Sequence, residues 1–143
     1  MPSWRDSSSQ QCQDDLDSLL NTALPFAQQM LEKRGGFYPF GAAMSASGEA
    51  RLLAGDASRD DLPASTTVLA SLLDGIRQAR AKYRAIAICS DVRLTDSDAV
   101  RVELEHQEGQ AMAVLLPYKK KRFGRGAEYG ELRGGTAGRQ VWS

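Results

Sequence analysis

Three strand-like segments follow one another in the second half of the chain, with only short turns between them. The first, 85–94 ("AIAICSDVRL"), begins as an almost continuous apolar run, which is typical of a central strand buried on both faces. The second, 99–106 ("AVRVELEH"), alternates apolar and charged residues, and the third, 111–118 ("AMAVLLPY"), follows the turn "QEGQ". Strands joined by short turns pair antiparallel. The pattern therefore predicts an antiparallel sheet.

Two helices are expected to cover this sheet, because two other segments carry apolar residues at spacings of three and four. The first helix is predicted over 14–34, before a pair of glycines, with a kink or a break at Pro25. The second helix is predicted over about 63–83. The residues before the first helix are polar, and we expect 1–13 to form a flexible arm.

A hairpin is expected between the two helices. Its strands are predicted over 37–45 and 50–54, joined by a turn that contains a glycine. Pro39 cannot donate to a sheet ladder, so that end of the strand should lie at an edge or precede the pairing. Gly41 and the two alanines after it indicate close approach by another element, most simply a helix lying across the sheet.

These elements predict the order α-β-β-α-β-β-β in one α+β domain over 14–143. The expected fold is an antiparallel sheet of five or six strands flanked by two helices, with an irregular, glycine-rich and basic segment from residue 118. Within that segment, "AEYGEL" and "RQVW" are each able to add a short peripheral strand. The order resembles that of profilin-like and roadblock-type domains over 14–118. The resemblance implies a sheet that serves partner binding and often dimerisation.

Composition and charge exclude several classes of protein. The 42% hydrophobic and 25% charged residues are close to the globular average, which argues against disordered, fibrous and membrane proteins. Eighteen cationic and eighteen acidic residues cancel, so the whole surface is not built to attract nucleic acid. No apolar run approaches the roughly 20 residues that span a bilayer, and no secretion signal is apparent at the start of the chain. We expect a cytoplasmic protein without a membrane partner.

The residue types that often carry catalysis are scarce, and no cofactor is expected. His106 is the single histidine, and a surface position at a strand end is the favoured interpretation over a general base oriented by Glu103 or Glu105. Alternation along 99–106 places Arg101, Glu103 and Glu105 together on the solvated face.

The two cysteines do not indicate a disulfide framework. Cys12 lies in the polar arm, and Cys89 lies in an apolar strand where burial raises the pKa of a thiol, so core packing is its expected role.

A small acidic cluster offers an alternative. Asp91 lies near the end of the apolar strand, and Asp96 and Asp98 lie further on. Carboxylates so placed are able to ligate magnesium or calcium in a metal-dependent enzyme. The spacing does not fit a calcium loop, however, because the turn glycine and the terminal glutamate are missing. A solvated loop is the favoured interpretation, and no residue is assigned as a metal ligand.

The stretch "LLPYKKKRFGRG" concentrates positive charge. From residue 118 to the last residue there are seven cations and two anions, a surplus of five. Such a segment suits an acidic protein surface, and its interleaved aromatics would also suit single-stranded nucleic acid. A solvated strand edge is the plain alternative. The candidate partner-binding residues are Tyr118, Lys119, Lys120, Lys121, Arg122, Phe123 and Arg125.

The aromatic run "FYPF" is a second candidate site. Phe37, Tyr38 and Phe40 are able to line a pocket for a small molecule, although such a group more often belongs to the core.

Taken together, the sequence favours a noncatalytic binding or regulatory module of the kind found among small bacterial proteins. The module is expected to recognise a protein partner, and a homodimer is compatible with this expectation. The metal-dependent enzyme and the nucleic-acid binder remain the alternatives.

Overall fold

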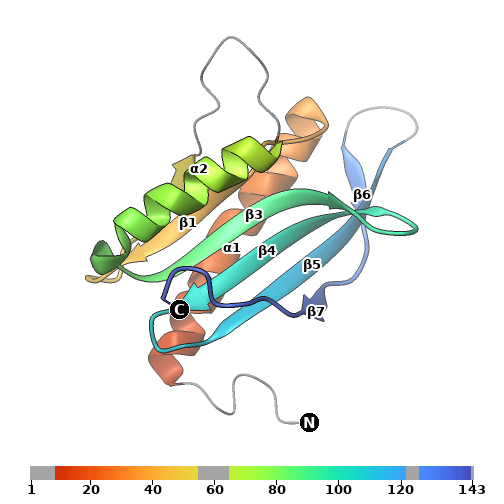
Figure 1. Cartoon of the computed structure of the whole chain (residues 1–143). Coiled ribbons are helices and arrows are strands. Elements are labelled where there is room, and N and C mark those ends of the chain that lie inside the picture. The colour runs from red at the N-terminus through yellow and green to blue at the C-terminus, as the bar shows by residue number, and fades with distance from the viewer. Residues whose placement is uncertain (1–8, 55–64, 122–125, 143) are drawn as a thin grey trace.

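The structure is a computed structural model, and it describes residues 9–54, 65–121 and 126–142. It belongs to the α+β class, with two helices and a curled antiparallel sheet (Figure 1). No helix in these ranges is long and apolar enough to cross a membrane. The elements are α1 (Gln10–Arg34), β1 (Phe40–Ser45), β2 (Ala50–Ala54), α2 (Ser65–Gln78), the 3-10 turn η2 (Arg80–Lys82), β3 (Tyr83–Arg93), β4 (Asp98–His106), β5 (Ala111–Lys120), β6 (Ala127–Tyr129) and β7 (Arg133–Gly135).

The strands follow the order β2-β1-β3-β4-β5-β6, and β7 also pairs with β5. Among the described residues the sheet thus has seven strands rather than the five or six expected, because two three-residue strands, β6 and β7, each pair with part of the outer side of β5. One of them, β6, lies within "AEYGEL" as expected. The other is β7, whereas "RQVW" forms no strand. The buried strand β3 lies between β1 and β4, as its apolar run predicted.

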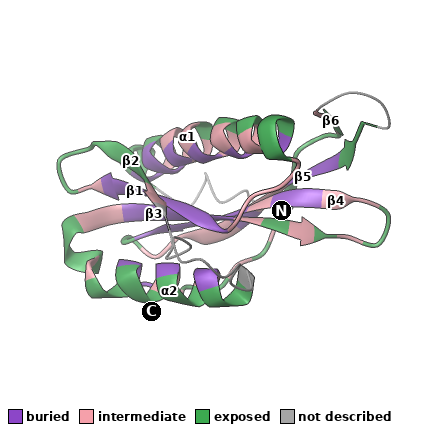
Figure 2. Cartoon of the chain, turned by 90° about the horizontal axis from the view of Figure 1, so that it is seen from above, coloured by how far each residue is buried: buried purple, intermediate pink, exposed green. Residues whose placement is uncertain are grey.

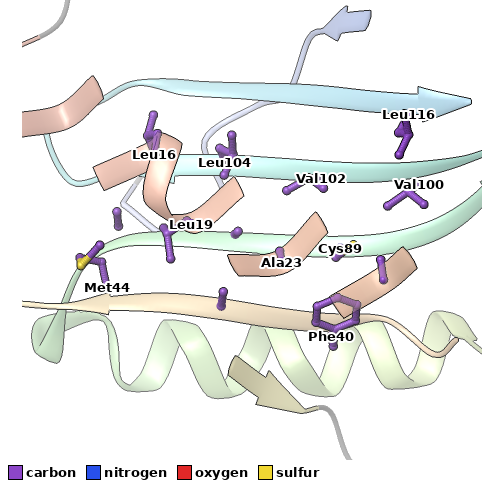
Figure 3. Packing of buried hydrophobic residues seen from close by; sticks show 14 of the residues in the cluster. Leu16, Leu19, Ala23, Phe40, Met44, Cys89, Val100, Val102, Leu104 and Leu116 are labelled. Atoms are coloured by element: carbon purple, nitrogen blue, oxygen red, sulfur yellow. The ribbon is translucent and has the colours of Figure 1, made fainter. Parts of the chain in front are cut away.

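The two helices lie on opposite faces of the sheet, so each face has its own core (Figure 2). The α1 residues Leu16, Leu19 and Ala23 pack against β3 and β4. Figure 3 shows Leu16 beside Leu104 of β4, and Ala23 beside Cys89 of β3. Under α2, Leu72 and Ile76 pack against β1 and β3. Burying one such leucine or isoleucine contributes about 1.5–3 kcal/mol, so both faces stabilise the fold.

The first helix begins earlier than expected and remains a single element. Ser9 caps it by accepting the Cys12 N–H through its hydroxyl at 3.0 Å, and Gly35 ends it at φ 75°. The expectation that 1–13 form an arm is therefore wrong for Gln10 onward, because Cys12 is fully buried on the helical stripe; residues 1–8 lie outside the described residues. The expected break at Pro25 is also wrong, since the helix continues through this exposed residue.

The second helix ends earlier than expected. It stops at Gln78, and Tyr83, which the apolar spacing placed on the helix, starts β3 and pairs with Ser45.

Gly41 has the close neighbours that its sequence context predicted. A Cβ atom on Gly41 would lie 3.1 Å from the Ala87 carbonyl oxygen and 3.4 Å from Leu72 Cδ1, so α2 approaches the sheet at a residue without a side chain.

Candidate partner-binding site at one end of the sheet

The three described lysines of the basic segment lie where several strands end side by side. Asp98 at the start of β4 pairs with Tyr118 near the end of β5, and Tyr118 pairs with Tyr129 of β6. The end of α1 reaches the same place, because a Cβ atom on Gly35 would lie 3.9 Å from Lys120 Nζ. Figure 1 shows β6 and the end of β5 at this end. We call Lys119, Lys120 and Lys121 the basic end of the sheet.

All three lysines are exposed. The ion pairs formed among the described residues involve Arg84, Arg93, Arg101 and His106, and none of them includes a lysine of the basic end. Lys119 and Lys120 continue the ladder with β6, and the Lys121 N–H donates to the Gly126 carbonyl at 3.1 Å. The remaining candidates Arg122, Phe123 and Arg125 lie outside the described residues.

Tyr118 lies in the interior rather than on the surface. Its side chain is 2% exposed, and its hydroxyl donates to Asp91 Oδ1 at 2.5 Å. Burial raises the pKa of Tyr118, and the hydrogen bond to Asp91 raises it further. Burial also raises the pKa of Asp91, although the hydroxyl of Tyr118 and the charge of Lys120 partly offset this. Tyr118 therefore anchors the strand that carries the lysines, and its ring is not available for stacking.

The aromatic run before β1 packs mainly into the core. Phe40 is 6% exposed and contacts the rings of Phe26 and Phe37 edge to face, with centroids 4.9 and 5.6 Å apart. Edge-to-face pairs of this kind add to the stability that burial provides. Tyr38 is half-buried. Phe37 and Phe40 therefore join α1 to β1, which is the core role that such groups more often have.

The three aspartates of the acidic cluster do not converge. Among the described residues, no three histidine, cysteine or acidic side chains are placed to hold a metal ion together. Asp91 accepts from Tyr118, and Asp98 lies 3.9 Å from the Arg93 Nε. Asp96 lines a surface hollow of about 260 Å³ between the β3–β4 turn and β6. That hollow mixes both signs of charge, and its lining includes Lys119, Glu128 and Arg133.

His106 is fully buried at the opposite end of β4, so its interpretation as a surface histidine is wrong. Its Nε2 lies 2.9 Å from Asp15 Oδ2, and its Nδ1 accepts the Glu108 N–H at 3.2 Å. Arg84 donates to both oxygens of the Asp15 carboxylate at 2.8 and 2.9 Å. Burial alone would raise the pKa of Asp15, but the hydrogen bonds from Arg84 and His106 outweigh it and hold this pKa below its ordinary value.

The two thiols are also internal. Burial raises the pKa of Cys12 to about 11, and nearby Glu108 and Asp15 act in the same direction. Burial raises the pKa of Cys89 as well. Because the thiolate is the reactive form, both cysteines are poor nucleophiles at neutral pH. Cys12 of α1 and Cys89 of β3 belong to the same core, between α1 and the sheet.

A buried carboxylate on β4 holds residues 140–142 against the sheet. Glu105 is 4% exposed, although alternation along β4 placed it on the solvated face. Its oxygens accept the backbone N–H groups of Gln140, Val141 and Trp142 at 2.7–3.1 Å. Arg77 Nε donates to the Gln140 carbonyl at 2.8 Å. Residues 136–142, which we call the C-terminal strap, thus cover Glu105 and remove it from solvent.

Sequence reasoning missed both of these internal networks. Asp15 and His106 are 91 residues apart, and Glu105 and Trp142 are 37 apart, so no local spacing links either pair. One signal was available, since Asp15 stands on the apolar stripe of α1, four residues before Leu19. An acid in such a position needs a buried partner.

Comparison with known proteins adds no assignment. The chain matches no family model, and no curated protein or solved structure is significantly similar to it. The functional argument therefore rests on the residues and contacts described above.

Proposed function

We propose that the chain is a noncatalytic binding or regulatory module that recognises an acidic protein partner through the basic end of the sheet. The observation that carries the proposal is the state of Lys119, Lys120 and Lys121. Three consecutive ammonium groups are exposed, and none forms an ion pair with a described carboxylate. Concentrated charge of one sign attracts a partner of the opposite sign and orients it.

The internal contacts of the usual catalytic groups support the noncatalytic part of the proposal. His106 is bound to Asp15 in the interior, and both thiols are buried with raised pKa values. A general base or a nucleophile must reach the atom on which it acts. The buried imidazole and thiols offer no such access.

The aromatic side chains of the segment distinguish the alternatives. A single-stranded nucleic acid would need exposed rings on which bases stack, and Tyr118 is buried and bound to Asp91. Phe123 is the other ring of the segment. A metal-dependent enzyme would need Asp91, Asp96 and Asp98 to converge, and no such group occurs among the described residues. The protein partner is therefore the better-supported proposal.

Two finer expectations belong with this proposal. The likeness to profilin-like and roadblock-type domains rests on element order alone. If it holds, the sheet itself takes part in binding the partner. The second expectation is a cytoplasmic location, in which case the acidic partner is also a cytoplasmic protein.

A capture experiment with charge-matched variants tests the proposal. The tagged wild-type chain, the variant Lys119→Ala/Lys120→Ala/Lys121→Ala and the control Arg80→Ala/Lys82→Ala/Arg139→Ala are each incubated at low salt with extract of the source cell. The control removes three exposed cations elsewhere on the surface. We expect an acidic protein to be retained by the wild type and the control, to be lost from the first variant, and to elute as salt rises.

Two results would overturn the proposal. One is that the lysine variant retains the same proteins as the control. The other is a shift of a single-stranded oligonucleotide on a gel that weakens steeply with salt and disappears in the lysine variant, because it would assign the basic end to nucleic acid instead.

A further inference from the structure

The two edges of the sheet are not alike. The outer side of β5 is covered along most of its length, by β7 at residues 113–115 and by β6 at residues 118–120. At the other edge, β2 pairs with β1, and no strand of the described ranges covers its outer side. An uncovered strand presents unpaired backbone N–H and C=O groups that are able to pair with another strand.

The register identifies the backbone groups that face outward. The Ser45 N–H donates to the Glu49 carbonyl at 2.8 Å, so these residues form a hydrogen-bonded pair at the start of the hairpin. Hydrogen-bonded and non-hydrogen-bonded pairs alternate along an antiparallel ladder. Arg51 and Leu53 therefore direct their backbone groups toward β1, whereas Ala50, Leu52 and Ala54 direct theirs away from it.

A groove runs beside this edge. It has a volume of about 550 Å³ and lies between β2 and α1. Leu52 is 42% exposed on the groove side and is one of two large exposed hydrophobic residues in the described part of the chain. The other residues that line the groove are Thr22, Pro25, Phe26, Gln28, Gln29 and Glu32, so all but Glu32 are uncharged.

The edge also lacks the features that usually prevent strand pairing. The sequence of β2 is "ARLLA", which contains no proline and no lysine. Its five residues pair with β1 one to one, without a bulge. Natural sheets protect exposed edges with lysine, proline or bulges. Arg51 is the single charge of the strand.

We infer that β2 is the docking site for a second copy of this chain, paired antiparallel with its own counterpart across a two-fold axis at Leu52. This arrangement places Leu52 opposite Leu52 and Ala50 opposite Ala54, so each outward N–H meets an outward C=O. A two-fold interface requires such self-complementarity. The two Leu52 side chains and the two grooves then bury each other's apolar surface.

Charge favours a second copy over the acidic partner at this edge. The chain has no formal net charge at pH 7, so two copies approach without long-range repulsion. The edge and its groove contribute one cation, Arg51, and one acid, Glu32, per copy. An acidic segment would find much less positive charge here than at the basic end. The dimer therefore uses residues other than those of the basic end, and it does not depend on the proposed partner.

The mass in solution tests the inference. Light scattering and analytical ultracentrifugation of the whole chain are run from micromolar to millimolar concentration. We expect the wild type to rise to twice the mass of one chain. Leu52→Lys should remain monomeric, because it places two ammonium groups face to face at the axis. Leu132→Lys is the matched control, since Leu132 is the other large exposed hydrophobic residue, at 53%.

A second variant tests the role of the backbone. Leu52→Pro removes an N–H that points away from β1, so it should abolish the dimer while circular dichroism shows the wild-type fold. A wild type that stays monomeric throughout would overturn the inference. So would a dimer that survives Leu52→Lys with unchanged affinity, or one that Leu132→Lys abolishes equally.

Discussion

The imidazole of His106 and the carboxylate of Asp15 form a buried contact in which Nε2 lies 2.9 Å from Oδ2. Because Nδ1 accepts the backbone N–H of Glu108, the proton of the neutral ring is on Nε2 and points at the carboxylate. Arg84 donates two further hydrogen bonds to the same carboxylate. A single acid of α1 therefore joins the helix to β3 and β4.

Replacing this acid should destabilise the fold strongly. Asp15→Ala leaves the buried ring and the half-buried guanidinium without their acceptor, which costs about 3–5 kcal/mol in systems of this kind. Urea unfolding followed by circular dichroism measures the loss. Asp14→Ala, at an exposed neighbouring position of α1, is the control and should change the free energy of unfolding by less than about 0.5 kcal/mol. Equal midpoints for the two variants would contradict the assigned role.

The contribution of Asp15 should depend on pH in a defined window. Arg84 and His106 outweigh the effect of burial and hold its folded-state pKa below the ordinary value, so the folded state favours the ionised carboxylate more than the unfolded state does. The stabilisation is present above the unfolded value of about 4 and is lost as pH falls through the lower folded-state pKa. The difference in unfolding free energy between the wild type and Asp15→Ala should shrink below about pH 4. A difference that is constant from neutral to acid pH would contradict this.

The hydroxyl of Tyr118 should influence the titration of Asp91. Tyr118→Phe removes a donor to the carboxylate, and that donor opposes the effect of burial, so the pKa of Asp91 should rise further. Carbon-detected NMR of the side-chain carboxyl group measures the shift. Tyr129→Phe is a matched control, because the buried hydroxyl of Tyr129 has no hydrogen-bond partner among the described residues. An unchanged pKa of Asp91 in Tyr118→Phe would refute the coupling.

The C-terminal strap should loosen when Glu105 loses its charge. Glu105→Gln turns one acceptor oxygen into an NH₂ donor that faces the backbone N–H groups of Gln140, Val141 and Trp142. Leaving such buried donors unsatisfied costs about 1–3 kcal/mol. Hydrogen exchange at these three amides should accelerate by at least about tenfold. Glu128→Gln, at an exposed position of β6 away from the strap, is the control. Equal exchange rates in the two variants would show that the strap is held by other contacts.

Local pattern predicted the identity of the main elements. Apolar spacings of three and four identified both helices, and continuous or alternating apolar runs identified β3, β4 and β5. Some boundaries were wrong, because they depend on pairing partners. Tyr83 fits the helical stripe by spacing, but it pairs with Ser45 and starts β3. Cys12 stands among polar residues, but it is fully buried on the core-facing side of α1.

For the candidate site, the sequence predicted only that positive charge is concentrated there. The run of lysines after Leu116 is visible in the sequence, and its exposed position agrees with that pattern. The burial of Tyr118 was not predictable, because it depends on Asp91, which lies 27 residues earlier. The same applies to His106, since its partner lies on the first helix.

By itself, the sequence determined which segments are helices, which are strands, and where positive charge gathers. These properties depend on residues that are close together in the sequence. The spacing of apolar residues indicates the type of each element, and the run of lysines and arginines indicates the charge. Only the tertiary structure decided that His106, Glu105 and Tyr118 are interior, that β5 is covered, and that β2 has an uncovered side. Each of these depends on segments that are distant along the chain and adjacent in space, and that adjacency arises when the two helices and the strands pack together.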